Sequence, residues 1–127
     1  MDVGTVVEGL LSGSIPPQAG LSALLIKGRE LPGEILKQLP YLTDRLVQDR
    51  DNDLVATNLE ILANLLESQE ASESVELLTQ DSTLSRLLFH LNNPEFSLRY
   101  PLLRIFISIA KLKRNTLQRY NIYYNCS

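Results

Sequence analysis

Apolar residues, mostly leucine, recur at three- and four-residue spacing along most of the chain, with polar residues between them. That spacing places the apolar side chains on one face of a helix, so it is typical of amphipathic α-helices. Residues 49–53 and 68–73 are polar and predict a turn and a loop. The predicted helices are 3–11, 18–30, 34–48, 54–67, 75–79 and 81–91. Pro40 is expected to divide the third of these, because proline lacks the N–H that a helix interior needs.

The longest apolar stretch is Pro94–Lys113. Asn93 is expected to cap a helix there, with Pro94 in the first helical position, and Pro101 is expected to interrupt it. The apolar residues after Pro101 surround nearly the whole helix, which predicts neighbours on both sides; they are Leu102, Leu103, Ile105, Phe106, Ile107, Ile109, Ala110 and Leu112. The stretch is too short and too closely flanked by charge to predict a membrane span.

Composition supports the same class of fold. The chain has 127 residues, 44% of them hydrophobic, with 6 glycines, 6 prolines and no tryptophan, and it lacks the alternating runs of β-strands. One all-α domain is therefore expected. The single Cys126 excludes an intrachain disulfide, and no signal peptide is evident at the N-terminus, so a cytoplasmic protein is expected.

The sequence also resembles itself at a fixed shift. A shift of 44 residues places Leu54 on Leu98, Leu59 on Leu103, Ile61 on Ile105, Leu62 on Phe106, Asn64 on Ser108 and Leu65 on Ile109. A fainter match at 38 residues places Leu21 on Leu59 and Leu24 on Leu62. Armadillo and HEAT arrays have periods of roughly 40–47 residues. We therefore expect an armadillo/HEAT-like helical-repeat solenoid of about two and a half repeats.

This solenoid is expected to occupy residues 1–114 as an incomplete domain, followed by a polar, tyrosine-rich tail at 115–127. The tail could anchor the chain through its apolar residues or simply be the frayed end of a truncated repeat. A last helix without a following neighbour would expose an apolar face, which favours self-association or chaperone capture.

Charge is distributed unevenly. Residues 1–94 carry a net charge of −8, whereas residues 95–127 carry +5. The basic residues at this end are Arg99, Arg104, Lys111, Lys113, Arg114 and Arg119. They could meet an acidic partner or a lipid surface, or they could gather near a helix C-terminus on a solvated face. The basic end lacks the interleaved aromatics of nucleic-acid-binding modules, so no nucleic acid is expected as a partner.

The residues of catalysis and metal binding are few. The lone His90 has no cysteine or second histidine nearby to build a zinc site, and no Gly-rich phosphate loop or nucleophilic triad is recognisable. Asp49, Asp51, Asp53 and Glu60 match positions 1, 3, 5 and 12 of a calcium loop, but Leu54 stands where that loop needs glycine. A helix cap is the better reading of these aspartates. No enzyme, metal or cofactor is predicted.

Three segments resemble the globular head of the general vesicular transport factor family, the golgin-type vesicle tethers. They are Gly20–Gln48, the Asp-rich turn 48–53 with the helix after it, and Phe96–Leu103. The last is the most specific, because it is similar to a family segment with Arg-aromatic-Pro before a long helix. The resemblance implies an armadillo-like head that binds Rab-type GTPases and SNARE proteins at the ER–Golgi boundary, peripheral on Golgi or vesicle membranes through these partners.

A non-enzymatic protein-interaction scaffold is therefore the expected function. Its candidate protein-binding residues are polar side chains on or beside the long helices: Asn58, Asn64, Arg99, Arg104 and Ser108. The alternative is that Asn64 and Ser108 only make local hydrogen bonds, and that Arg99 pairs with an acidic neighbour. A generic armadillo/HEAT adaptor, such as a chaperone cofactor or proteasome assembly factor, is the alternative function.

Overall fold

The computed structural model describes the backbone of residues 1–125 and the side chains of residues 1–114. Eight helices and no β-strand are present in this part of the chain, which confirms the predicted all-α class. The helices are α1 (Val3–Ser12), α2 (Pro17–Glu30), α3 (Pro32–Lys37), α4 (Leu39–Gln48), α5 (Asn52–Leu66), α6 (Ala71–Leu78), α7 (Asp81–Leu91) and α8 (Phe96–Asn125).

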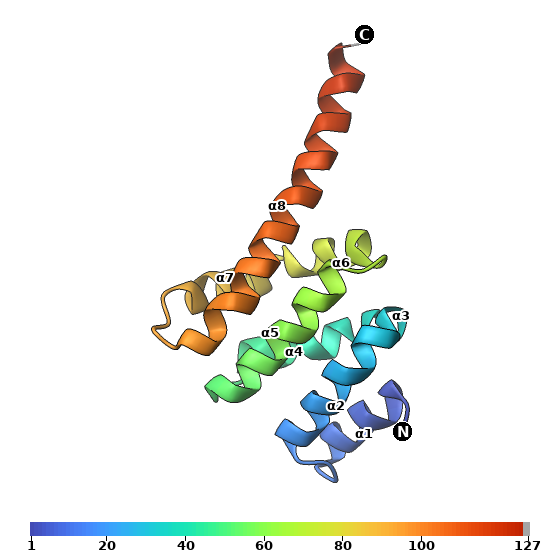
Figure 1. The fold of residues 1–127 in the computed structure, drawn as a ribbon, viewed down its shortest axis with the longest axis vertical. Helices are drawn as coiled ribbons and strands as arrows, with labels where there is room; N and C mark the ends of the chain where they lie inside the picture. The colour runs from blue at the N-terminus through green and yellow to red at the C-terminus, as the bar shows by residue number, and fades with distance from the viewer. Residues whose placement is uncertain (126–127) are drawn as a thin grey trace.

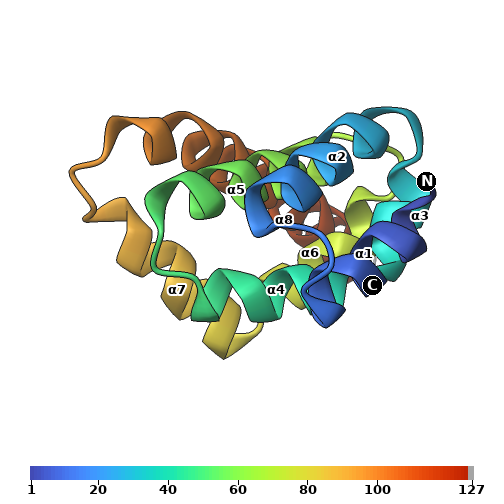
Figure 2. The ribbon, with the colours of Figure 1, turned by 90° about the horizontal axis from the view of Figure 1, so that it is seen from below.

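The longer helices form two layers. Figure 1 shows α2, α5 and α8 side by side and running in the same direction, with α5 in contact with both of the others. Seen from below in Figure 2, α4 and α7 lie in a second layer beneath them, and these two helices also contact each other. Helix α1 packs against α2 at one end of the arrangement, while α8 lies at the other end and projects beyond the rest.

Helix α5 lies at the centre of the core, and local chemistry fixes where it begins. The Asp51 carboxylate accepts hydrogen bonds from the backbone N–H groups of Asp53 (2.8 Å) and Leu54 (3.4 Å), so the predicted cap is confirmed. Leu59 and Leu62, one turn apart, are fully buried. A helix with apolar residues at this spacing gains most of its stability from packing them against neighbours, here α2, α4 and α8.

Two predicted boundaries differ from the structure. The division within 34–48 occurs at Gln38 rather than at Pro40, because proline is tolerated in the first turn of α4, where its missing N–H needs no partner. Helix α6 begins at Ala71, inside the predicted loop 68–73. Ala71, Val75 and Leu78 share one face of this helix, and the burial of the last two favours the helix over a loop.

Helix α8 departs most from its prediction. It begins at Phe96, and Asn93 accepts a hydrogen bond from the Glu95 N–H (2.9 Å) in the turn before it, so the predicted start at Pro94 is wrong. The predicted interruption at Pro101 is also wrong, since the helix continues past it. Pro101 removes one hydrogen bond to the Ser97 carbonyl and crowds that carbonyl, and packing of the helix against α5 offsets this cost.

The predicted self-similarity agrees with burial on one side of the long helices only. Leu21 and Leu59 are both fully buried, in accordance with the 38-residue shift, and so are Ile61 and Ile105 at the 44-residue shift. Leu59 and Leu103 differ, because Leu103 is 55% exposed. Helices α5, α6 and α7 contact α8, but Leu103 and Ile107 stay exposed, so the prediction that neighbours cover α8 on both sides is wrong for the described residues.

The predicted tail, 115–127, is described only in its backbone and only as far as Asn125. That backbone continues α8 without a break at residue 115. The side chains proposed as an anchor, Tyr120, Ile122, Tyr123 and Tyr124, lie outside the described part of the chain, as do Cys126 and Ser127.

Candidate interaction surface

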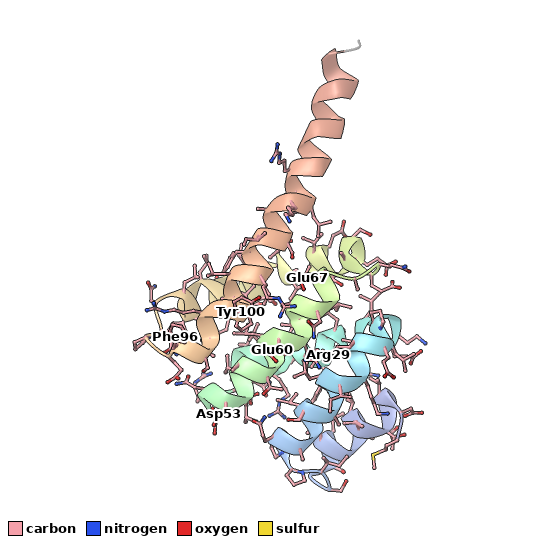
Figure 3. The ribbon with its side chains drawn as sticks, viewed as in Figure 1. Arg29, Asp53, Glu60, Glu67, Phe96 and Tyr100 are labelled. Carbon is pink, nitrogen blue, oxygen red and sulfur yellow. The ribbon has the colours of Figure 1, made fainter. Side chains whose placement is uncertain are left out.

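The exposed side of the α2–α5–α8 layer, called the outer face below, is the side that Figure 3 presents to the viewer. Asp53 and Glu60 of α5 and Glu67, the residue just after it, follow one another at seven-residue intervals. Seven residues are close to two helical turns, so the three carboxylates form one acidic line. Phe96 and Tyr100 on α8 lie on one side of this line, and both are largely exposed.

Two of the predicted site residues, Asn64 and Arg104, meet on this outer face. The Arg104 Nη2 group donates a hydrogen bond to the Asn64 Oδ1 atom (2.7 Å) and another to the Glu67 carboxylate. Its Nε–H donates to the second Glu67 oxygen (3.1 Å), which makes the ion pair bidentate. The Arg104 guanidinium also lies 5.8 Å from the Tyr100 ring centre, within the range of a cation–π contact. These bonds join α5 to α8.

The charges of this pair stabilise each other. The hydrogen bond from Arg104 lowers the pKa of the Glu67 carboxyl below its ordinary 4.5, although partial burial acts in the opposite direction. The same bond raises the pKa of Arg104. Glu67 was not among the residues singled out from the sequence. The sequence indicated such a pair only through its charge distribution, because residues 1–94 are net acidic and the last helix is net basic.

A shallow groove crosses the outer face near the start of α5 and α8. It encloses about 450 Å³ and is lined by Gln18, Asp53, Ala56, Thr57, Glu60 and Ser97. The Gln18 side-chain amide of α2 donates a hydrogen bond to the Thr57 hydroxyl of α5 (3.0 Å), which fixes one wall of the groove. Two carboxylates and several neutral polar groups line the groove, and no nucleophile–base pair converges there. These groups suit recognition of a polar or basic surface.

Arg104, Glu67 and Asn64 are called the Arg104 cluster below. The other predicted site residues lie apart from this cluster. Arg99 is exposed on α8, and no ion pair with an acidic neighbour is present among the described residues. Ser108 is half-buried on the same helix. Asn58 is fully buried, and its side-chain amide donates a hydrogen bond to the Leu42 carbonyl of α4 (2.9 Å). Asn58 therefore joins two helices inside the core, and it is not available to a partner at the surface.

An apolar stripe on α8 was not located from the sequence. Phe96, Tyr100, Leu103 and Ile107, called the α8 stripe below, are exposed by 79%, 69%, 55% and 53%. Their spacing of four, three and four residues places them along one side of the helix. The sequence indicated apolar residues all around this helix, but it gave no sign of which side a neighbour would cover.

The residues weighed for metal binding have other roles. Asp49 forms an ion pair with Arg45 (3.0 Å), and Asp51 caps α5, so the aspartates do not converge on a calcium loop. The described residues contain no group of three or more side chains placed to hold a metal ion. His90 is 3% exposed, and neither of its ring nitrogens has a hydrogen-bond partner among the described groups. Burial lowers the pKa of this imidazole, and the nearby Arg86 and Arg50 cations lower it further.

Within the part of the chain that the structure describes, none of the helices combines the length and the hydropathy needed to cross a bilayer. Comparison of the chain with protein-family models, with curated proteins and with solved structures found no match.

Proposed function

We propose that this protein is a non-enzymatic interaction scaffold built from armadillo/HEAT-like helical repeats. The observation that carries the proposal is the single layer of α2, α5 and α8, which lie side by side and run in the same direction (Figure 1). A layer of parallel helices arises when one helical unit is repeated along an axis, and such arrays bind proteins across the surface that the layer presents.

The order of the elements supports this arrangement. A long helix, a short helix and a helix of intermediate length follow one another as α2, α3 and α4, and again as α5, α6 and α7. Helix α8 then occupies the position of a third long helix. The separations between matching residues, 38 and 44, are near the period of such repeats.

Within that class, we propose the role of a vesicle-tether head that binds Rab-type GTPases and SNARE proteins in the cytoplasm, at the surface of Golgi or transport-vesicle membranes. Support comes from the segment Phe96–Leu103, whose resemblance to the tether family is the most specific. Its Phe96, Arg99 and Tyr100 side chains are exposed at the start of α8, where a protein partner can contact them. A chaperone cofactor or proteasome assembly factor with the same architecture is the alternative.

Binding of purified Rab-type GTPases to the immobilised chain tests this role. We expect tighter binding of the GTP-loaded than of the GDP-loaded form, and a loss of about tenfold or more in affinity for the Arg99→Glu variant. Glu8→Arg, an exposed substitution on α1 at the other end of the layer, is the matched control and is expected to bind like the parent chain. Equal binding in both nucleotide states, or no binding to any member of a Rab panel, would reject the tether role and favour the adaptor alternative.

A further inference from the structure

We infer that the α8 stripe is a stacking site for an amphipathic helix that carries acidic side chains and is supplied by another protein. This inference rests on the proposed scaffold function and names the kind of partner that the scaffold binds. It begins with the pairing of α5 and α8, an interface inside the molecule that shows how one long helix receives the next.

The face of α5 that receives α8 can be identified. Glu67, the residue that follows the last turn of α5, binds Arg104 of α8, so this side of α5 faces α8. Ala63 and Leu59 lie four and eight residues before Glu67, about 40° and 80° around the helix at 3.6 residues per turn, so they lie near the side that faces α8. Both are fully buried.

The α8 stripe corresponds to that face. The 44-residue shift places Leu59 on Leu103 and Ala63 on Ile107. The two positions on α5 are 0% exposed, whereas Leu103 and Ile107 are 55% and 53% exposed. Helix α8 thus presents apolar side chains at the positions where α5 receives its neighbour, and among the described residues no helix covers them. The spacing of the stripe suits a helix as the occupant, because side chains four and three residues apart form the seam of paired helices.

Charge decides what kind of helix fits. On α5, Asn64 and Glu67 bind the incoming Arg104 of α8. The same shift places Ser108 and Lys111 at these positions on α8, and Lys111 is exposed. The position that accepts a cation on α5 therefore carries a cation on α8. If another helix packs on α8 as α8 packs on α5, a carboxylate at its position equivalent to Arg104 would stabilise it.

A second copy of the chain fits the stripe poorly. Arg99, Lys111 and Arg114 are exposed on α8, and residues 95–127 carry a net charge of +5. A parallel pair of α8 helices would place each of these cations beside its copy, and an antiparallel pair would place Arg99 near Arg104. Residues 95–127 contain one acidic residue, Glu95, to balance them. The charges therefore favour an acidic partner helix over a symmetric dimer.

Two peptide probes test the inference by fluorescence anisotropy with the full chain. Both contain residues 94–113; one keeps Arg104, and the other carries Arg104→Glu. Their apolar residues are identical, so the difference in affinity reports the charge at one position. We expect the Arg104→Glu peptide to bind about tenfold tighter than the unchanged peptide, and Lys111→Glu in the chain to reverse the preference.

Two variants of the chain localise the binding. Ile107→Asp lies on the α8 stripe and is expected to weaken binding of the Arg104→Glu peptide by about tenfold or more. Ile26→Asp, which changes a side chain of α2 that is 63% exposed, is the matched control and is expected to have no effect. Both positions are exposed, so both variants are expected to fold, and thermal melts followed by circular dichroism verify this.

Three results would overturn the inference: equal affinity of the two peptides, undetectable binding of both, or the same effect of the two variants. A dimer of the chain in sedimentation that Ile107→Asp dissociates would assign the stripe to a second copy instead. The GTPase experiment is independent of these results. Nucleotide-dependent GTPase binding without peptide discrimination rejects only the stacking site, and the converse rejects only the tether role.

Discussion

Arg104 of α8 donates hydrogen bonds to both carboxylate oxygens of Glu67, the residue that ends α5. The two residues are 37 positions apart in the sequence, and no local pattern links them. Their side chains are 21% and 45% exposed, so water weakens the pair without removing it. This bond joins the last helix to the rest of the molecule and sets the charge pattern from which the partner of α8 is inferred.

A double-mutant cycle measures the strength of that bond. For Arg104→Ala, Glu67→Ala and the double variant in urea, we expect a coupling free energy of about 1 kcal/mol at neutral pH. The exposed pair Glu34–Lys37, with side chains 48% and 70% exposed, is the control and is expected to show no measurable coupling. Equal coupling in the two pairs would contradict the assignment of a structural role to Arg104.

The same pair predicts a dependence on pH. The pKa of Glu67 is lowered in the folded chain, so its contribution to stability is present above the unfolded-state pKa near 4.5. It is lost as the pH falls through the lower, folded-state value. We expect the coupling between Arg104 and Glu67 to decrease when the cycle is repeated below pH 4.5. Coupling that stays constant through this range would show that the carboxylate charge does not contribute.

His90 predicts a second dependence on pH. Its folded-state pKa is lowered, mainly by burial and further by Arg86 and Arg50, so the folded chain binds fewer protons than the unfolded chain. The free energy of unfolding is expected to fall as the pH drops below 6.5, the ordinary value for histidine. His90→Leu is expected to remove this loss between pH 7.5 and 5.5. Leucine is the natural choice, since Leu46 lies 44 residues earlier and is also buried. An unchanged loss in the variant would exclude His90 as its source.

Asn58 predicts a cost for removing a buried hydrogen bond. Its amide donates a hydrogen bond to the Leu42 carbonyl, while its Oδ1 atom has no partner among the described residues. Asn58→Ala is expected to lower the free energy of unfolding by about 1–3 kcal/mol, because it leaves a cavity and removes this bond. Asn58→Leu is expected to cost less, since Leu102 is buried at the position 44 residues later. Urea unfolding of both variants checks this. Because both variants lack the hydrogen bond, a larger loss for leucine would show that leucine does not fit the space that Asn58 occupies.

The close approach of Gly20 in α2 to Leu10 in α1 predicts that tight packing holds these two helices together. A Cβ atom at this position would lie 2.3 Å from the Leu10 Cδ2 atom, so Gly20→Ala forces α1 and α2 apart at an expected cost of about 1–3 kcal/mol. At Gly4 the nearest such contact is 3.8 Å, and Gly4→Ala is expected to be neutral or to stabilise α1 by up to about 1 kcal/mol. Hydrogen exchange should show lost protection in α1 for Gly20→Ala alone. Equal protection in both variants would mean that the Leu10 side chain moves aside and that α1 stays packed against α2.

Much of the fold followed from the sequence because its signals are local. The spacing of residues such as Leu59 and Leu62 indicates a helix wherever that helix packs, and Asp51 caps α5 with its own side chain. The predicted interruption at Pro101 was wrong because it considered local effects alone. The cost of a proline in a helix is local, but packing of α8 against α5 offsets it, and this packing involves residues far apart in the sequence.

The candidate site was less predictable, because it depends on contacts between distant segments. Asn64 and Arg104 were both expected to bind proteins, yet in this structure they bind each other. Asn58 resembles them in the sequence but lies in the core, since a polar residue on a helix carries no sign of which neighbour will cover it. Only the long-range repeat indicated the α8 stripe. Comparing the exposure of residues related by the 44-residue shift showed which side of α8 no described helix covers.

The measurement that tests the account most directly is the distance between α2 and α8. With Cys126 replaced by serine, spin labels at Ile26→Cys and Ser108→Cys would lie on the outer face of these two helices, separated by α5. Packed helices are 8–10 Å apart, so the two axes should be about 16–20 Å apart, and a single narrow distribution near this value is expected. A broad distribution, or one centred beyond roughly 30 Å, about three helix diameters, would contradict the parallel layer on which both the scaffold function and the α8 docking site depend.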